Sequence, residues 1–140
     1  MFFALAPFLG WFVSGCLKFA INYVRFGKEA KDRIGNGGFP STHTTIITTT
    51  TVLIGWNDGF FSPIFGLGIA VILIVIIDAA GLRRAVGYHA VSLNQLKSEL
   101  QHRESIGHTK IEILGGLFLG VILGSIMYLV MTQFHNLVRL

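Results

Sequence analysis

Long apolar stretches dominate the chain. Three of them, Phe2 to Val24, Phe60 to Ala80 and Ile111 to Phe134, contain the roughly 20 mostly apolar residues that a membrane-spanning helix needs. A fourth stretch, Ser41 to Trp56, mixes many threonines with Ile, Val and Leu. Because threonine hydroxyls can bond to the carbonyl one turn earlier, we expect a fourth spanning helix here, with a tilted or re-entrant helix as the alternative.

Two polar segments separate these stretches, Arg25 to Gly38 and Arg83 to Lys110. In the second, apolar residues recur at three- to four-residue spacing, which predicts an amphipathic helix. They are Val86, Ala90, Leu93, Leu96 and Leu100. This helix is too polar to span, so we expect it to lie along the membrane surface or to cover the helix ends. The predicted fold is an all-α integral membrane bundle of about four transmembrane helices plus one amphipathic surface helix, with residues 1–140 as a single membrane-embedded domain.

Composition supports a membrane protein, since 52% of the residues are hydrophobic and only 13% are charged. Soluble chains carry about 25% charged residues. The single cysteine, Cys16, excludes a disulfide scaffold. Most of the 11 Lys and Arg residues lie in the two polar segments, so the positive-inside rule places these segments in the cytoplasm and both termini outside, in a plasma membrane of bacterial type. This topology accounts for the net charge of +4 without a nucleic-acid partner.

The segment Gly37-Gly38-Phe39-Pro40-Ser41-Thr42-His43 directly precedes the Thr-rich helix. Glycines let backbone N–H groups approach a phosphate, and a helix N-terminus offers unpaired donors. We therefore expect Gly38, Ser41 and Thr42 to bind phosphate. His43, at the membrane edge, could protonate a leaving oxygen. The alternative is an ordinary helix cap.

A second motif, Gly107-His108-Thr109-Lys110-Ile111-Glu112, begins the last span. Four-residue spacing places His108 and Glu112 on one helix face. The carboxylate can then accept the imidazole N–H and fix its tautomer, which leaves the other ring nitrogen free to attack as a nucleophile. A surface ion pair is the alternative interpretation.

The remaining candidates are cationic. Arg83 and Arg84 follow Asp78 at the end of a span; they could clamp phosphate oxygens or act as a cytoplasmic stop signal, and Asp78 is expected to pair with one of them. Lys18 lies inside an apolar helix, where an ammonium is costly unless it snorkels or meets an anion, and it shares a helix face with Arg25. The other histidines are expected at the surface, and their spacing supports no metal site. They are His89, His102 and His135.

Together these motifs resemble the type 2 phosphatidic acid phosphatase and vanadium haloperoxidase superfamily, whose signature is K-x6-R-P, P-S-G-H and S-R-x5-H-x3-D. The corresponding residues here are Lys18-x6-Arg25-Phe26, Pro40-Ser41-Thr42-His43 and His108-x3-Glu112. The chain is most similar to the short, divergent membrane branch related to acid phosphatases and haloperoxidases. That branch is typified by G-G-x-P-S-x-H, D-A-x-G-x-R-R and G-H-x-x-x-E.

The resemblance implies a metal-independent phosphatase without a cofactor. Lys18, Arg25 and Ser41 would hold phosphate oxygens, His43 would be the acid, and His108 would form a phosphohistidine oriented by Glu112. Thr42 stands where the superfamily has Gly, and Phe26 where it has Pro. The position of the superfamily's third-motif arginine is occupied by His102, so Arg83, Arg84 or Arg103 would take that role. The superfamily core has six helices, and assembly into a homo-oligomer would complete a shorter bundle.

We therefore expect a membrane lipid phosphatase that hydrolyses a lipid phosphomonoester or diphosphate through a phosphohistidine intermediate. Positive side chains would stabilise the charge on the phosphoryl group. The alternative is a non-catalytic membrane protein that retains a pocket for phosphate or anionic lipid. Haloperoxidase chemistry is not expected in so small and lipid-embedded a chain.

Overall fold

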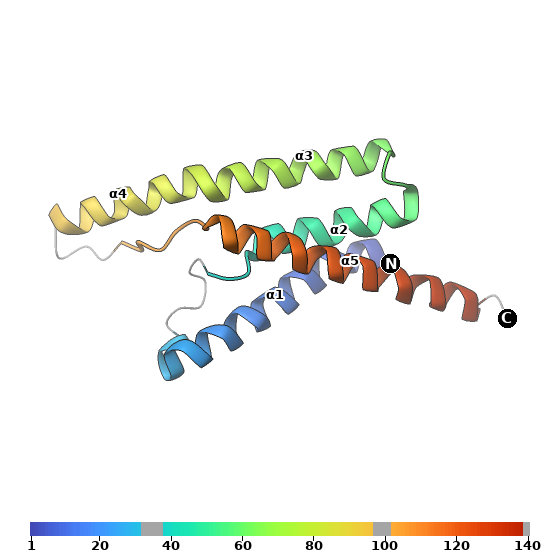
Figure 1. Ribbon diagram of the computed structural model, residues 1–140, viewed down its shortest axis with the longest axis horizontal. Coiled ribbons are helices and arrows are strands. Elements are labelled where there is room, and N and C mark those ends of the chain that lie inside the picture. The colour runs from blue at the N-terminus through green and yellow to red at the C-terminus, as the bar shows by residue number, and fades with distance from the viewer. Residues whose placement is uncertain (32–37, 97–101, 139–140) are drawn as a thin grey trace.

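The computed structural model describes residues 1–31, 38–96 and 102–138, with the side chain of Glu29 excepted. Within these ranges every regular element is helical, which confirms the all-α class. The elements are α1 (Phe2–Phe26), a short 3-10 helix (Gly27–Ala30), α2 (Thr42–Asp58), α3 (Pro63–Ile77), a π-helical turn (Asp78–Leu82), α4 (Arg83–Leu96) and α5 (Lys110–Val138) (Figure 1).

Three helical stretches are long and apolar enough to cross a membrane: α1, the continuous stretch Pro63–Leu96, and α5. The predicted Thr-rich helix is confirmed as α2, but it has 17 residues. At 1.5 Å per residue it measures about 26 Å, less than the hydrocarbon core of about 30 Å. This length is at the short end of the range of about 17 to 25 residues that spans a membrane, and the full fourth span stays a prediction. Within the bundle, α2 lies in contact with α1, α3 and α5.

Several buried threonines of α2 have their hydroxyls bonded within the helix, whereas the buried Thr48 hydroxyl has no partner among the described residues. Thr45, Thr49 and Thr51 donate to carbonyls four residues earlier, at 2.8 to 2.9 Å. This is the back-bonding that the sequence predicted, and it hides polar groups from an apolar surrounding. The bonds explain how a helix so rich in hydroxyls occupies the centre of a membrane bundle.

Three glycines of α5 let it approach α2 closely. A Cβ at Gly116 would lie 2.6 Å from the Ser41 carbonyl oxygen, one at Gly120 would lie 2.5 Å from the Thr48 Cβ, and one at Gly124 would lie 2.7 Å from the Thr49 carbonyl oxygen. Four-residue spacing places these glycines on one face, the arrangement by which membrane helices pack at short range. This G-x3-G-x3-G pattern, which was not recognised from the sequence, positions the start of α5 beside the start of α2.

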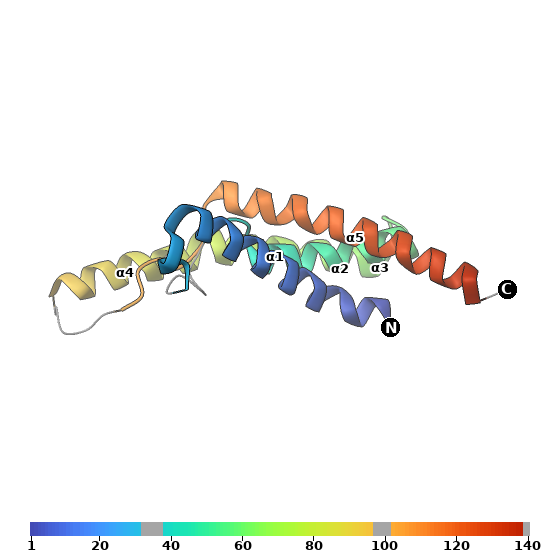
Figure 2. The ribbon, with the colours of Figure 1, turned by 90° about the horizontal axis from the view of Figure 1, so that it is seen from below.

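The predicted amphipathic helix is confirmed as α4, while its placement along the membrane surface or over the helix ends stays a prediction. The π turn joins α3 to α4 without a break, and Figures 1 and 2 show α4 continuing the direction of α3. Leu100 of the predicted pattern lies outside the described residues. The buried face of α4 receives the segment 102–107, because a Cβ at Gly87 would lie 2.7 Å from the Glu104 carbonyl oxygen.

The starts of α2 and α5, the π turn and the C-terminal half of α1 gather at one end of the bundle (Figure 1). Two backbone hydrogen bonds join these elements. Ser41 N donates to the Glu112 carbonyl at 2.9 Å, and His108 N donates to the Ala79 carbonyl at 3.0 Å. The polar motifs that are far apart in the sequence therefore meet at this end.

Candidate active site

His108 is held between the π turn and the start of α5. Its backbone N–H donates to the carbonyl of Ala79, which lies in the π turn. A π turn departs from the regular α-helical bonding pattern and is frequent at functional sites. Gly107, just before His108, has a φ of 93°, and a Cβ there would lie 2.8 Å from Arg84 N. Glycine at this position therefore lets the loop press against the helix and present His108.

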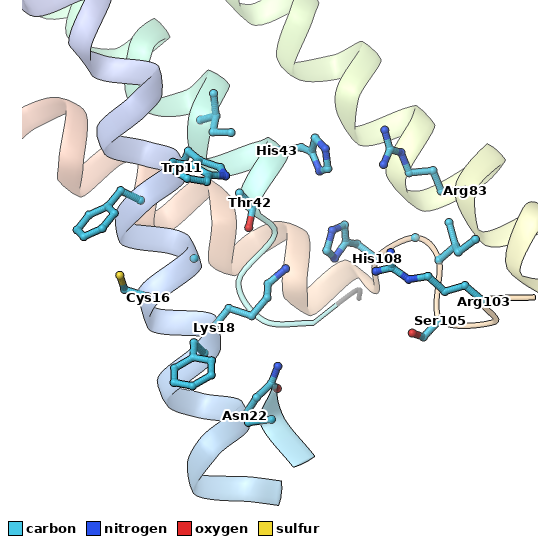
Figure 3. A pocket seen from close by; sticks show the side chains of 17 residues that line it. Trp11, Cys16, Lys18, Asn22, Thr42, His43, Arg83, Arg103, Ser105 and His108 are labelled. Carbon is cyan, nitrogen blue, oxygen red and sulfur yellow. The ribbon is translucent and has the colours of Figure 1, made fainter. Parts of the chain in front are cut away.

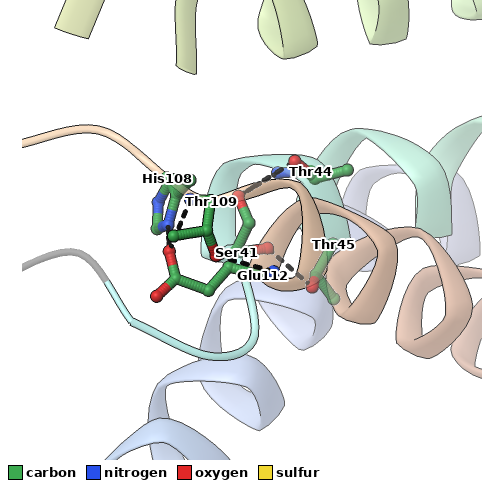
Figure 4. A network of polar contacts seen from close by, with 6 residues as sticks. All are labelled: Ser41, Thr44, Thr45, His108, Thr109 and Glu112. Atoms are coloured by element: carbon green, nitrogen blue, oxygen red, sulfur yellow. Dashed lines mark hydrogen bonds and ion pairs between the residues drawn. The ribbon is translucent and has the colours of Figure 1, made fainter. Parts of the chain in front are cut away.

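The imidazole of His108 is buried, with 7% of its surface exposed, and its Nδ1 lies 3.0 Å from Oε2 of Glu112. The same carboxylate oxygen accepts the backbone N–H of Thr109 at 3.0 Å, while Glu112 N donates to Thr109 Oγ1 at 3.3 Å (Figure 4). These reciprocal bonds form a capping box. Because a carboxylate only accepts, Nδ1 donates, and Nε2 is left with the free lone pair of the neutral ring.

Burial lowers the pKa of His108 below its ordinary value of 6.5. The hydrogen bond to Glu112 acts in the opposite direction, whereas the positive charges of Lys18 and Arg83 add to the lowering. The ring is therefore neutral at pH 7 and has a lone pair, the form that a nucleophile requires.

His108 borders a cavity of about 760 Å³ whose polar part is cationic. Figure 3 shows side chains from α1, α2, α4 and the loop before α5 around this space. The polar lining includes Lys18, Thr42, His43, Arg83, Arg103 and His108. Lys18, Thr42 and both predicted catalytic histidines thus meet at one cavity. Of the three arginines left open by the sequence, Arg83 and Arg103 line this cavity and Arg84 does not.

The rest of this cavity is apolar and was not foreseen from the sequence. Its lining includes Trp11, Phe12, Gly15 and Phe19 of α1, together with Ile46 of α2. Trp11, Gly15 and Phe19 recur every four positions, with Phe12 three before Gly15, a spacing that groups side chains on one helix face. The spacing was visible in the sequence, but only the fold distinguishes this face from the others of an apolar helix.

A second cavity of about 330 Å³ adjoins the first, and Asn22 and residues 105–108 line both. It is lined by Arg25, Gly38, Arg84 and Glu112, among others, and shares His108 with the first cavity. Lys18 and Arg25, which were expected to act together, therefore border different cavities. Arg84 also donates to the Tyr88 hydroxyl at 3.0 Å.

Asp78 pairs with Arg83, as expected from the sequence, and the bond runs from Arg83 Nε to Asp78 Oδ2. The five-residue separation matches the π turn that contains Asp78. The pair holds Arg83 at the edge of the first cavity, while Asp78 itself lines neither cavity.

Ser41 lies in neither cavity. It is fully buried, its Oγ is 2.9 Å from Thr44 Oγ1, and it accepts the Thr44 N–H as the N-cap of α2. This placement corresponds to the helix-cap alternative. Gly37 of the same motif lies outside the described residues.

The three remaining histidines are exposed, as predicted. Within residues 1–31, 38–96 and 102–138, no three His, Cys, Asp or Glu side chains come together as a metal-binding group.

The buried histidine–carboxylate pair beside a cationic cavity, in a helical membrane bundle, is the arrangement that the resemblance to type 2 phosphatidic acid phosphatases implied. The chain belongs to the Divergent PAP2 family, whose model matches residues 2–123. A curated relative from Bacillus subtilis (strain 168), described as an uncharacterized membrane protein YuiD, is 25% identical over 107 residues, which cover 62% of this chain and 68% of the relative. None of the solved structures matches the chain.

Proposed function

We propose that this protein is a membrane lipid phosphatase that hydrolyses a lipid phosphomonoester or diphosphate through a phosphohistidine intermediate. The observation that carries the proposal is the contact between His108 Nδ1 and Glu112 Oε2 at 3.0 Å beside a cavity lined by cationic side chains. Membership in the Divergent PAP2 family supports the same chemistry.

In the first step, Nε2 of His108 attacks phosphorus, the N–P bond forms, and the bond from phosphorus to the lipid oxygen breaks. Lys18, Arg83 and Arg103 border this cavity and would stabilise the charge on the phosphoryl oxygens. His43, on the same cavity, would give its proton to the departing lipid oxygen. The Glu112 carboxylate stabilises the positive charge that develops on the His108 ring.

In the second step, water attacks the phosphohistidine and the P–N bond breaks. His43, now neutral, takes a proton from this water as a general base. Inorganic phosphate leaves, and His108 returns to its neutral form with Nδ1 still donating to Glu112. Both steps balance without a metal ion or another cofactor.

The test is release of phosphate by the purified protein in detergent from a panel of lipid phosphates and diphosphates, with and without vanadate. We expect turnover by the wild type, inhibition by vanadate, and no turnover by His108→Ala or His43→Ala. His89→Ala is the matched control, because His89 is exposed on α4 and lines neither cavity. A His108→Ala variant as active as wild type would overturn the mechanism. Lipid phosphate binding without any turnover would favour the non-catalytic alternative.

We further propose that the site faces the cytoplasm, as the distribution of basic residues predicts. In a Cys16→Ser background, a membrane-impermeant maleimide applied to intact cells should label Asn57→Cys and not Gln95→Cys. Both positions are exposed, Asn57 in the last turn of α2 and Gln95 in the last turn of α4; these two helix ends lie at opposite ends of the molecule in Figure 1. The reverse labelling pattern would place the site on the outer side.

A further inference from the structure

The larger cavity has two chemically different ends, and α1 forms part of both. Trp11 and Phe12 are 60% and 61% exposed and belong to the apolar end. Lys18 and Asn22 follow toward the C-terminus of α1 and belong to the polar end, with Lys18 half-buried. Trp11 and Lys18 are separated by about 10 Å along the helix axis. Along α1 the lining thus begins with aromatic side chains alone, and a cation and an amide join it toward the C-terminus, where Phe19 lies next to Lys18.

Gly15 lies at the gap in the aromatic lining. A Cβ at this position would meet nothing within 4 Å beyond the backbone of its own helix. Trp11 is one turn before Gly15 and Phe19 is one turn after it, so the three lie on one face. The side chain of Cys16, next to Gly15, is exposed and also lines the cavity. The cavity lining formed by α1 therefore leaves space beside Gly15, with the aromatic rings of Trp11 and Phe19 one turn before and one turn after it.

A single ligand that fills the whole cavity must provide a chemical partner for the cationic end and for the apolar end. The cationic end needs an anion, since burying Lys18 in an apolar helix is costly without one. The apolar end needs a hydrocarbon, because the aromatic rings offer it no charged partner. An amphiphile with an anionic head at the membrane interface and a chain toward the membrane centre meets both needs in its ordinary bilayer orientation.

We propose that the part of the larger cavity beside Gly15, between Trp11 and Phe19 (the groove), holds the hydrocarbon chain of the phosphate lipid. Because glycine has no side chain to fill this space, Gly15 makes the protein selective for long-chain substrates. The inference rests on the proposed function for the chemistry of the headgroup. It adds a chain-binding subsite and a residue that determines specificity. The chain lies between Trp11 and Phe19 while the phosphate reaches Lys18, Arg83 and His108.

The first test compares dioleoyl phosphatidate with the water-soluble p-nitrophenyl phosphate. Gly15→Leu should lower kcat/KM for the long-chain lipid by about tenfold or more, a loss of about 1.4 kcal/mol or more in transition-state binding. It should leave turnover of the soluble ester nearly unchanged. Gly66→Leu is the matched control, because a Cβ at Gly66 also meets nothing within 4 Å and Gly66 lines neither cavity. Equal effects of Gly15→Leu on both substrates would overturn the inference while the phosphatase remained.

The second test needs no catalysis and no variant. The only cysteine of the chain is Cys16, so maleimide labelling in detergent reports on the groove directly. Dioleoyl phosphatidate at about ten times its Kd should slow labelling about tenfold. Dioleoylglycerol and inorganic phosphate, each having one half of the amphiphile, should protect far less.

The two tests separate the two proposals. Protection of Cys16 in a protein that releases no phosphate would retain the lipid subsite and reject the phosphatase. Unchanged labelling of Cys16 with dioleoyl phosphatidate, in a protein that does hydrolyse this lipid, would reject the subsite. Slower labelling on raising the protein concentration alone would indicate that a second copy covers the groove and would also reject the subsite.

Discussion

The backbone N–H of His108 donates to the carbonyl of Ala79 at 3.0 Å, which ties the candidate nucleophile to the π turn between α3 and α4. The same turn contains Asp78, which pairs with Arg83 at the cavity. One local irregularity in a long helix therefore positions both a histidine and an arginine. This hydrogen bond brings the D-A-x-G-x-R-R and G-H-x-x-x-E segments together in the fold.

Gly107→Ala tests this relationship. The new Cβ would lie 2.8 Å from Arg84 N and 3.1 Å from the Ala79 carbonyl oxygen, at a φ of 93°. We expect the free energy of unfolding in detergent to decrease by more than about 1 kcal/mol. We also expect kcat/KM to fall at temperatures where the variant is still folded, because His108 is displaced. The control is Gly81→Ala, where a Cβ meets nothing within 4 Å. Equal behaviour of the two variants would contradict the close approach at Gly107.

Glu112→Gln separates the two roles of this residue. Glutamine can keep the capping box with Thr109, so stability should stay close to that of the wild type. Without the carboxylate, the positive charge on the His108 ring loses its partner, and kcat should fall by about 10³-fold or more. Glu112→Ala should lose the cap as well, at about 1 kcal/mol of stability. Full activity of Glu112→Gln in the phosphate-release assay would show that Glu112 only caps α5.

The lowered pKa of His108 predicts where activity is lost in acid. The mechanism needs His108 neutral and His43 protonated, so kcat/KM should rise as the pH falls through 6.5 and decrease only once the pH falls below the lowered pKa of His108, where protonation removes the lone pair of Nε2. The folded state binds this proton more weakly than the unfolded state. The stability contribution is therefore complete above pH 6.5 and is lost as the pH falls from 6.5 to the lowered pKa. A pH series of kcat/KM and of thermal stability, compared with His108→Gln, measures both effects.

The close contact between the glycines of α5 and helix α2 predicts that a large side chain at Gly120 lowers stability. Gly120→Leu would bring its Cβ to 2.5 Å from the Thr48 Cβ and add further atoms beyond it. We expect α5 to separate from α2, at a cost of about 1–3 kcal/mol for overpacking, and the thermal stability in detergent to fall accordingly. Gly66→Leu, on the open side of α3, should change stability little. Similar stability of both variants would contradict the close α2–α5 contact.

The cavities that Arg83, Arg84 and Arg103 line predict how strongly each substitution should lower kcat/KM. Arg83 and Arg103 border the larger cavity with Lys18, whereas Arg84 borders only the smaller one. Arg83→Ala and Arg103→Ala should each lower kcat/KM for a lipid phosphate by about 10²-fold or more, because each removes charge from the phosphoryl oxygens. Arg84→Ala should have a smaller effect. The ranking would be wrong if Arg84→Ala were the most damaged of the three.

The sequence could predict contacts that lie within one helix. Residues four positions apart lie on the same face of any α-helix, so the pairing of His108 with Glu112 followed from their spacing alone. The back-bonding of Thr45 and Thr49 followed from the same geometry. A capping box from Thr109 to Glu112 was equally visible as T-x-x-E and was overlooked. Local hydrogen bonds of this kind depend only on the helix that contains them.

Contacts between helices could not be predicted in this way. Lys18 and Arg25 share a face of α1, yet Lys18 lines the larger cavity and Arg25 lines the smaller one. Nothing in the spacing of Arg103 placed it in the larger cavity, since its position depends on how residues 102–107 lie against α4 at Gly87. The amphipathic helix was predicted without its direction, because the π turn that continues α3 into α4 has no simple sequence pattern.

By itself the sequence determined an all-α membrane protein, its apolar helices and the histidine–carboxylate pair, because hydrophobic length and helical periodicity are properties of the chain read in order. The tertiary structure alone decided which cations share a cavity with His108, that Ser41 caps α2, and that one face of α1 forms an apolar wall. These features arise where helices meet. Their geometry depends on close approaches such as those at Gly107 and Gly120, which only the folded chain brings about.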